Sequence, residues 1–486
     1  MRKVKKNKEV SLKNIIDNEI KTNSLRENFP EHLKIHVSKL KDKKAETHHD
    51  FTDIPFITID GEDSKDFDDA VWSESFGKKS KIMVAIADVG FYVENGDPLD
   101  KEAKRRANSF YFPDRVIPMF PEELSNNLCS LVPNKKRKSI IVEINFQNGK
   151  YKNFKIHRGI IKSFARLTYK QVEGFFFTNK KQCKLTKLIN NLFVTYKMLK
   201  IESIKREKIF FNPNEWEYDY YDTKEISLKK KKKLQSYNLI EEFMVLTNSI
   251  IGNYFKKNKV KSIFRNHEPP QKEKLNIINN IINEYNLDHN GKFNSQKDFN
   301  QIIRLINLNK NNHLHDFLLR SQSKAFYGFN NKGHYGLSLD NYVHFTSPIR
   351  RYSDLIVHRD LINLYFNNKK EPAIDISDHL NSQEKKADLI ERSIMDKFVA
   401  LYMKKFKYRV FRGFVDAIES FGIFIKALDF PFSGLARIKL KKEKNYNKNK
   451  ININIGTLVT FKIKRINTFN GKILLQKVKL IENHGN

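Results

Sequence analysis

Cysteine is scarce in this chain: its 486 residues include only Cys129 and Cys183. Two thiols cannot build a zinc cluster or a disulfide framework, so we expect small buried residues in a reducing compartment. Long apolar runs are also missing. The basic N-terminus is not followed by an apolar signal core, and no run approaches the length of a membrane span. The sequence therefore predicts a cytoplasmic protein with no membrane partner.

Glycine-rich phosphate-binding motifs are absent as well. There is no P-loop, no dinucleotide-binding fingerprint and no Gly-x-Ser-x-Gly elbow, which disfavours ATPases, dehydrogenases and serine hydrolases. Acidic residues are outnumbered, with 56 against 90 lysines and arginines and a formal net charge of +34. This excess predicts a polyanionic partner, nucleic acid first and an anionic membrane surface second. An AT-rich genome also encodes abundant Lys, Asn, Ile and Phe, which reduces the weight of the charge without removing it.

Composition and patterning predict a folded chain of two to four domains, because 40% of the residues are hydrophobic and 12% aromatic. We expect residues 1–50 to be mostly helical in character and to form an extended basic arm or linker. Mixed strand and helix patterns predict an α+β domain with a mixed sheet over 51–406. Five short β-type runs then predict an OB-fold barrel over 407–480, a fold that often binds single-stranded nucleic acid. A barrel that serves only as a spacer is the alternative.

Local patterns predict particular elements of the α+β domain. Residues 140–146 and 154–161 have the pattern of a strand pair, with Asn148-Gly149 as the turn between them. The run 229–233 consists of lysines, and we expect it to be the solvated start of a helix, with a phosphate contact as the alternative. Apolar residues three and four apart predict a long helix over 377–405.

One stretch is strongly acidic: six of the ten residues from Asp60 to Asp69 are Asp or Glu. Apolar, strand-like runs flank it on both sides. A solvated acidic loop is one interpretation. However, carboxylates this dense repel one another unless a cation holds them, and the continuation of a calcium-binding EF-hand loop is missing. The second interpretation is a magnesium-type site that processes a phosphate group.

A second informative stretch is the run FTSPIRRY at residues 345–352. Ser347 and Pro348 have the pattern of an N-cap and a first helical residue. Arg350 and Arg351 would then lie in the first turn, where the helix dipole favours anions, so we expect them to bind a phosphate. Alternatively, these arginines pair with carboxylates, including those of the acidic stretch. Carboxylates, magnesium and an arginine together would form a site that cleaves phosphodiesters.

Several motifs, in this order along the chain, resemble the RNase II/RNase R (RNB-domain) family of exoribonucleases. The first motif contains aspartates at spacings of six, two and one, and the last resembles the S1 domain with which the family ends. The resemblance extends over roughly residues 25–480. The matching segments are 58–70 (TIDGEDSKDFDDA), 109–113 (SFYFP), 116–125 (VIPMFPEELS), 128–131 (LCSL), 344–355 (HFTSPIRRYSDL), 420–424 (SFGIF) and 434–437 (GLAR).

The resemblance implies a processive 3′→5′ exoribonuclease that degrades RNA to nucleoside 5′-monophosphates with Mg²⁺. It implies that Asp68 is required for cleavage and that Arg350 holds the scissile phosphate. The implied metal ligands are Asp60, Asp66, Asp68 and Asp69. It also implies an aromatic clamp on the last bases at Tyr111. The other implied RNA-binding residues are Tyr169, Arg351, Glu391, Phe421, Phe424 and Arg437.

The implied partners are the 3′ ends of single-stranded RNA and accessory proteins of RNA degradation, and we expect a monomer. Relatives of the RNase R type have cold-shock domains before the catalytic domain, and about 50 residues cannot supply them. They also have a lysine-rich tail after the S1 domain, for which we expect no counterpart in this sequence. Arg437 stands where a histidine is common in the family. These departures concern RNA unwinding and the entry route. There are two alternatives to an exoribonuclease. One is an inactive RNB relative that regulates RNA by binding it, which the complete set of aspartates disfavours. The other is a metal-dependent endoribonuclease.

Overall fold

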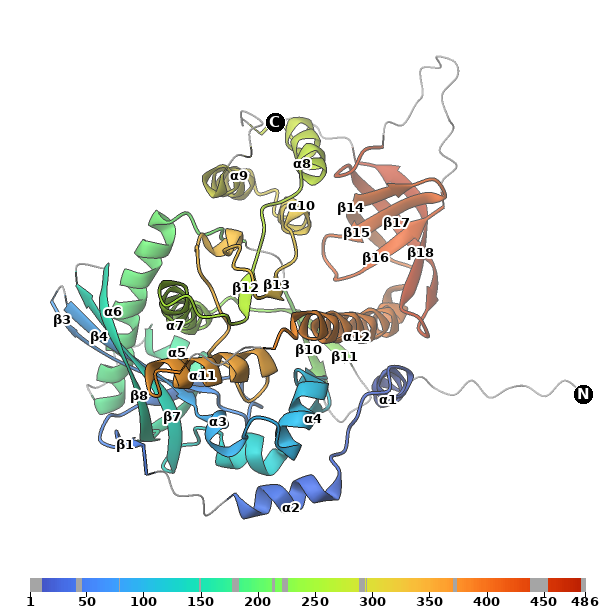
Figure 1. The fold of residues 1–486 in the computed structure, drawn as a ribbon. Helices are drawn as coiled ribbons and strands as arrows, with labels where there is room; N and C mark the ends of the chain where they lie inside the picture. The colour runs from blue at the N-terminus through green and yellow to red at the C-terminus, as the bar shows by residue number, and fades with distance from the viewer. Residues whose placement is uncertain are drawn as a thin grey trace, which may run out of the picture.

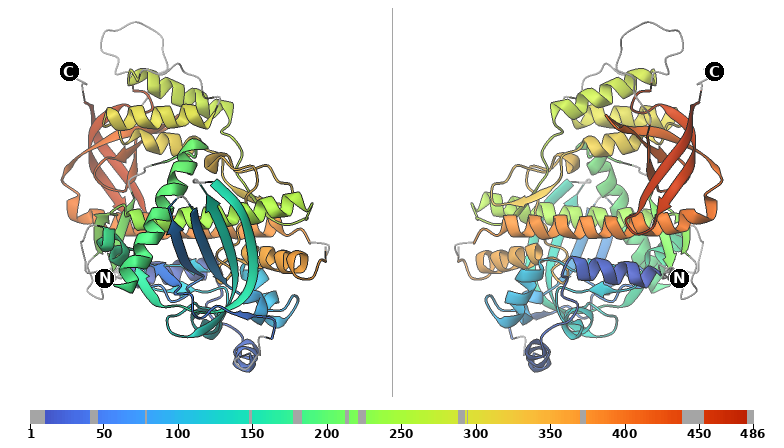
Figure 2. Two further views of the ribbon diagram at one scale, coloured as in Figure 1. Left: turned by 90° about the vertical axis from the view of Figure 1, so that its left-hand side faces the viewer. Right: turned by 90° about the vertical axis from the view of Figure 1, so that its right-hand side faces the viewer.

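The computed structural model describes residues 11–40, 46–77, 79–147, 150–176, 183–211, 215–220, 226–287, 293, 295–369, 374–437 and 453–481. A sheet domain and a small barrel lie on opposite sides of the long helix α12 (Ser377–Met403) (Figures 1 and 2). The predicted α+β domain followed by a small barrel is confirmed. The predicted domain boundaries stay predictions.

The sheet domain is built on seven strands in the order β1-β8-β7-β4-β3-β2-β9. Successive side chains of β4 point to opposite faces: Ile82, Val84 and Ile86 enter one hydrophobic layer, while Met83 and Ala85 enter the other. The sheet is therefore covered on both faces. Its strands are β1 (His49–Asp50), β2 (Ile57–Asp60), β3 (Asp69–Phe76), β4 (Lys79–Ala87), β7 (Lys136–Gln147), β8 (Lys150–Lys162) and β9 (Ala165–Thr168).

Two long helices, α6 (Lys184–Lys205) and α7 (Gln235–Lys257), pack on the first layer through residues such as Leu192 and Phe243. The second layer lies under the short helices α3 (Val89–Tyr92) and α4 (Pro98–Arg106), the π-helical segment η1 (Glu123–Leu128) and the start of α11 (Tyr352–Tyr365). The remaining elements of this domain are α5 (Tyr169–Phe176), the hairpin β5 (Phe110–Tyr111) and β6 (Val116–Ile117), the hairpin β10 (Trp216–Tyr220) and β11 (Ile226–Lys230), and the pair β12 (Phe264–Asn266) and β13 (Phe326–Gly328).

The described N-terminal residues are helical as expected, but they do not form an extended arm. The described residues before the sheet form helices α1 (Leu12–Thr22) and α2 (Glu31–Lys39). The apolar side of α1 is buried against α12 and the β5–β6 hairpin, with Ile16 1% exposed. A helix with such an apolar side is stabilised by tertiary packing and does not extend into solvent.

The C-terminal barrel has five strands and is closed in the order β14-β15-β16-β18-β17, consistent with the predicted OB-fold. Gly422 is needed at the β14–β15 turn, because its φ is +150° and a Cβ there would lie 2.3 Å from the Ala436 carbonyl oxygen. The strands are β14 (Val410–Glu419), β15 (Gly422–Ala427), β16 (Ser433–Ala436), β17 (Leu458–Asn467) and β18 (Lys472–Leu480).

Three further helices join the barrel to the sheet domain: α8 (Lys272–Glu284), α9 (Gln296–Leu308) and α10 (Leu314–Ser321). Phe414 of the barrel packs into their core, with its ring centroid 5.2 Å from that of Phe317. The barrel is thus fixed to the rest of the molecule. In the part of the chain that is described, no helix combines the length and apolar character needed to cross a bilayer.

Several local predictions have a clear outcome. The β7–β8 pair and the long helix are confirmed, while the turn at 148–149 lies outside the described residues. The prediction that a helix starts at 229–233 is wrong. Lys229 and Lys230 are in β11, and the helix, α7, begins only at Gln235. Cys129 is buried as expected, but Cys183 is exposed at the N-terminus of α6.

Candidate active site

The acidic stretch connects two neighbouring strands, because β2 ends at Asp60 and β3 begins at Asp69. These strands are antiparallel, so their connected ends meet. The connection is fixed by backbone hydrogen bonds: the Phe67 N–H donates to Ser130 Oγ (3.0 Å), and the Ala87 N–H donates to the Asp68 carbonyl (2.9 Å). The fold therefore brings the four aspartates predicted as metal ligands to one place, which we call the acidic group (Asp60, Asp66, Asp68 and Asp69).

Electrostatics within the acidic group are unfavourable for the ionised carboxylates. Burial raises the pKa of Asp60 to about 8, and the charges of Asp69 and Asp66 add to the rise. Burial likewise raises the pKa of Asp69 to about 6, although Arg350 opposes it. The pKa of Asp68, which is only 4% exposed, is raised well above its usual range by burial. These carboxylates would be stabilised in their ionised form by an added positive charge.

Asp68 is held by the segment that contains the two predicted arginines. Its Oδ1 accepts a hydrogen bond from the Ile349 N–H at 2.8 Å. Arg350 Nε lies 3.5 Å from its Oδ2, and Arg350 Nη2 donates to Ser347 Oγ at 3.0 Å. The Arg350 side chain is 44% exposed, so it can contact both the acidic group and a bound phosphate.

The predicted position of the two arginines at a helix start is wrong. Helix α11 begins at Tyr352, with Arg351 as its N-cap residue, because the Ser347 N–H donates to Asp354 Oδ1 and Arg351 bridges to Asn108. The Arg351 guanidinium donates to Asp354 Oδ1 at 2.7 Å, an ion pair across the N-terminus of α11. Arg350 thus contacts the acidic group, whereas Arg351 is paired with a carboxylate outside it.

Two tyrosines lie at the acidic group. The Tyr111 O–H donates to Asp66 Oδ2 at 2.6 Å, and the side chain is 45% exposed. Tyr169 begins α5, directly after the β9 residue that pairs with Asp60. Burial and the charges of Asp69 and Asp60 raise the pKa of Tyr169. The structure therefore brings both predicted tyrosines to the acidic group; their RNA-binding roles stay predictions.

Three groups near the site were not found from the sequence. Arg166 on β9 donates to the backbone carbonyls of Gly61 and Glu62, the latter at 2.7 Å, and its charge opposes the rise in the pKa of Asp60. The ring centroid of Tyr237 lies 4.3 Å from that of Tyr169. The third group is the Ile349 N–H. Of these three groups, only Arg166 could have been placed from the sequence, and only if the pairing of β9 with β2, which sets Arg166 beside Thr58, had been predicted.

The residues present fit a hard cation. Asp60 Oδ2 and Asp68 Oδ2 are buried and have no hydrogen-bond partner among the described residues. Within those same residues, no group of three or more His, Cys, Asp and Glu side chains has the arrangement needed to hold a metal ion. The donor set is therefore unlike a closed, all-protein cage. It fits Mg²⁺, which is usually bound through one or two carboxylates and several waters.

Comparison with known proteins shows the family to which this fold belongs. The sequence model of the RNB domain matches residues 48–367. The chain belongs to the RNB-domain family. Ribonuclease R of Buchnera aphidicola subsp. Schizaphis graminum is 34% identical over 423 residues, which cover 82% of this chain and 58% of the relative. This RNB-domain chain thus spans a little more than half the length of the curated relatives it matches.

Solved structures share the RNB-domain fold. Mycoplasma genitalium RNase R in complex with ribose methylated single-stranded RNA superposes with a TM-score of 0.88 at 29% identity, over 97% of this chain and 78% of that one. Yeast Ssd1, a pseudonuclease, superposes with a TM-score of 0.68 at 16% identity. A likeness at such low identity shows the fold alone, so activity has to be argued from the residues of the site.

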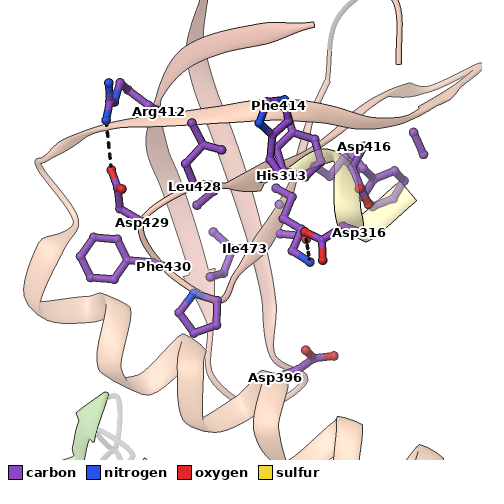
Figure 3. A pocket seen from close by; sticks show the side chains of 18 of the residues that line it. His313, Asp316, Asp396, Arg412, Phe414, Asp416, Leu428, Asp429, Phe430 and Ile473 are labelled. Atoms are coloured by element: carbon purple, nitrogen blue, oxygen red, sulfur yellow. Dashed lines mark ion pairs between the residues drawn. The ribbon is translucent and has the colours of Figure 1, made fainter. Parts of the chain in front are cut away.

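The RNB-domain chain also has a cleft of about 960 Å³ between the barrel, α10, α12 and the β10–β11 hairpin, which we call the barrel cleft. Its walls mix aromatic and charged side chains, and Asp396 reaches into it from α12 (Figure 3). Much of the charge is paired: Lys426 lies 3.0 Å from Asp316, and Arg412 lies 3.9 Å from Asp429.

Two of the four remaining predicted RNA-binding residues line the barrel cleft. Phe421 is 57% exposed, and its ring meets that of Phe424 edge to face at 6.2 Å. Arg437 is exposed just beyond β16, and it is not among the described lining residues. Glu391 is exposed on α12; its neighbour Arg392 lines the cleft, whereas Glu391 does not. The structure therefore does not bring Arg437 or Glu391 to the acidic group or to this cleft.

Proposed function

We propose that this chain is a processive 3′→5′ exoribonuclease that hydrolyses RNA to nucleoside 5′-monophosphates at the acidic group, with Mg²⁺. The observation that carries the proposal is the meeting of four aspartates with Arg350 and Tyr111, residues that lie up to 290 positions apart in sequence. The similarity to ribonuclease R supports the same activity. The proposal includes a cytoplasmic monomer that acts on the 3′ ends of single-stranded RNA, helped by accessory proteins of RNA degradation.

Of Asp60, Asp66, Asp68 and Asp69, the metal would be held directly by one or two carboxylates, mainly through the oxygens that lack hydrogen-bond donors, and by the others through bound waters. When bound, Mg²⁺ lowers the pKa of a coordinated water and neutralises charge that develops on the phosphate. The Ile349 N–H fixes the orientation of Asp68. Asp68 then keeps one oxygen directed away from the backbone, toward the side of Arg350.

Arg350 would hold the scissile phosphate. Its Nε faces Asp68, and the partly exposed guanidinium retains N–H donors for phosphate oxygens. Such a donor stabilises the charge of the transition state more than that of the bound RNA, because the charge on the phosphate increases there.

The exposed ring of Tyr111 would stack on a base near the 3′ end, while its hydroxyl remains on Asp66. Stacking tolerates any base, as a degradative enzyme requires. The barrel cleft would guide the single strand through Phe421 and Phe424, and we keep RNA-binding roles for Tyr169, Arg351, Glu391 and Arg437 as weaker parts of the proposal. For Arg351 that role is indirect, because its guanidinium is paired with Asp354.

The proposal is tested by incubating a 5′-labelled single-stranded RNA with the protein, with and without Mg²⁺, beside a duplex with a 3′ overhang. We expect release of nucleoside 5′-monophosphates from the single strand only when Mg²⁺ is present, with chelator as the control. An inactive RNA-binding relative would bind the RNA and release nothing. Release of 3′-phosphorylated products, or equal rates without a divalent cation, would reject the proposed chemistry.

A further inference from the structure

A second cleft, of about 710 Å³, lies on the other side of the β10–β11 hairpin from the barrel cleft; we call it the hairpin cleft. Trp216 and Lys230 are paired across the hairpin, and both line the barrel cleft. The adjacent residues Glu215 and Lys231 line the hairpin cleft instead. Successive residues of a strand face opposite sides, so the base of this one hairpin is the wall between the two clefts.

Two tyrosine rings lie between the hairpin cleft and the acidic group. Tyr237 lines the cleft, and its ring centroid is 4.3 Å from that of Tyr169. Tyr169 in turn directly follows Thr168, whose backbone pairs with that of Asp60. These two tyrosine rings therefore connect the surroundings of the acidic group with the hairpin cleft.

The acidic residues of the hairpin cleft already have partners. Glu215 is 2.9 Å from Lys231, Glu241 is 2.7 Å from Lys208, and Glu207 accepts a hydrogen bond from Asn300. Lys232 and Arg304 also line the cleft and are exposed. Among the described residues, no carboxylate lies within 4.0 Å of either cation. Within the described part of the chain, the cleft therefore offers two cations without an acidic partner, whereas Arg350 at the acidic group is paired with Asp68.

Aromatic side chains complete the lining. Phe210 and Phe211 are partly buried beside the basic residues, and Tyr237 forms the inner wall. Rings of this kind stack on nucleobases irrespective of sequence, and lysine and arginine bind phosphate. The volume is within the range of about 300–1,000 Å³ that is usual for small-molecule sites. The combination suits a molecule with one base and one phosphate.

We propose that the hairpin cleft binds the nucleoside 5′-monophosphate product and is its way out, so that RNA and product use opposite sides of the β10–β11 hairpin. The inference rests on the proposed exoribonuclease activity for the source of the ligand. A separate route would allow the next nucleotide to advance along the barrel cleft before the previous product has left the protein.

Adenosine 5′-monophosphate tests this inference in calorimetric titrations of the full chain without a divalent cation, where the acidic group repels a phosphate. The informative variant is Lys232→Gln with Arg304→Gln. Its matched control is Lys256→Gln with Lys257→Gln, two exposed lysines at the opposite end of α7. Loss of the two cations should weaken binding by about tenfold or more, as for removal of charge-assisted contacts to phosphate. The control variant should bind like the wild type.

Equal affinity in the wild type and in the Lys232/Arg304 variant, or no binding by the wild type at millimolar nucleotide, would overturn the inference. Adenosine without phosphate should bind more weakly than the monophosphate; equal binding would also contradict a phosphate site. These titrations need no RNA cleavage. The cleft can therefore bind the nucleotide even if the cleavage assay fails, and the protein can cleave RNA even if the cleft binds no nucleotide. Failure of the cleft and failure of the proposed activity are therefore distinguishable.

Discussion

The acidic group and the barrel cleft hold their charges in opposite ways. In the acidic group, buried carboxylates face one another, and Oδ2 of Asp60 and Oδ2 of Asp68 lack hydrogen-bond donors among the described residues. In the barrel cleft, acids and bases are paired, as in Lys426 with Asp316, and aromatic rings such as Phe421 are exposed. Unpaired buried charge calls for a bound cation and thus for chemistry, whereas paired charge beside exposed rings suits sequence-tolerant binding.

Asp68→Asn should separate chemistry from binding most strongly. Asparagine still accepts the hydrogen bond from the Ile349 N–H but lacks the charge, so cleavage should fall by about 10³-fold while RNA binding stays close to that of the wild type. Cleavage rates and gel shifts on the same RNA measure both. Asp63→Asn, in the exposed part of the same loop, is the control. Parallel loss of binding and cleavage would reject a catalytic role for Asp68.

Substitutions at the neighbouring arginines Arg350 and Arg351 should have different effects, one on cleavage and the other on stability. Arg350→Ala should lower cleavage by roughly 10²-fold, the effect of losing a donor to the transition state, with little change in stability. Arg351→Ala should instead destabilise the fold by roughly 2–4 kcal/mol, because the buried Asp354 loses its ion-pair partner.

Cleavage assays combined with denaturant unfolding distinguish the two effects. A near-normal rate in Arg350→Ala would make this residue a structural partner of Asp68 only. Unchanged stability in Arg351→Ala would mean that its pairing with Asp354 contributes little.

Phe421→Ala should weaken RNA binding by roughly three- to tenfold, the loss of one stacked base, and leave the melting temperature unchanged because the ring is exposed. Fluorescence anisotropy with a labelled single strand measures the affinity. Phe76→Ala is the matched control, since Phe76 is similarly exposed (63%) at the end of β3. Equal effects of the two substitutions would mean that the barrel serves as a spacer.

The smallest effect concerns stability and pH. Without metal, Asp60 has a pKa of about 8 in the folded protein, so the fold retains a proton that the unfolded chain loses above pH about 4. The folded state is therefore destabilised as pH rises between these values. Asp60→Asn removes this contribution. Its melting temperature should exceed that of the metal-free wild type by a few °C at pH 8 and by less at pH 5.

Scanning calorimetry at both pH values checks the difference, and Mg²⁺ should reduce it at pH 8 by binding the ionised wild-type carboxylates. A difference that does not change with pH would contradict the raised pKa of Asp60.

The acidic group was largely predictable because its aspartates lie within ten residues, on a loop between two strands with clear apolar patterns. The barrel was predictable for the same reason: its strands are local runs. The helical character of the N-terminal residues was predictable too, but their packing was not, since the apolar side of α1 is buried by the distant β5–β6 hairpin and by α12.

The start of α11 and the place of Lys229 and Lys230 were also set by tertiary contacts. Ser347 would be a good N-cap, but its N–H is bound by Asp354, and the chain turns once more before the helix begins. Lys229 and Lys230 pair with Glu217 and Trp216 across a hairpin. Arg166 and Tyr237 carry no motif at all; only the folded chain places them beside the acidic group.

The central claim is that RNA is degraded from its 3′ end at the acidic group. Degradation of two 5′-labelled RNAs of one sequence, one with a free and one with a blocked 3′ end, tests it most directly in the presence of Mg²⁺. We expect the free strand to shorten stepwise from its 3′ end and the blocked strand to remain intact. Internal cuts at equal rates in both strands would contradict the account and indicate an endonuclease.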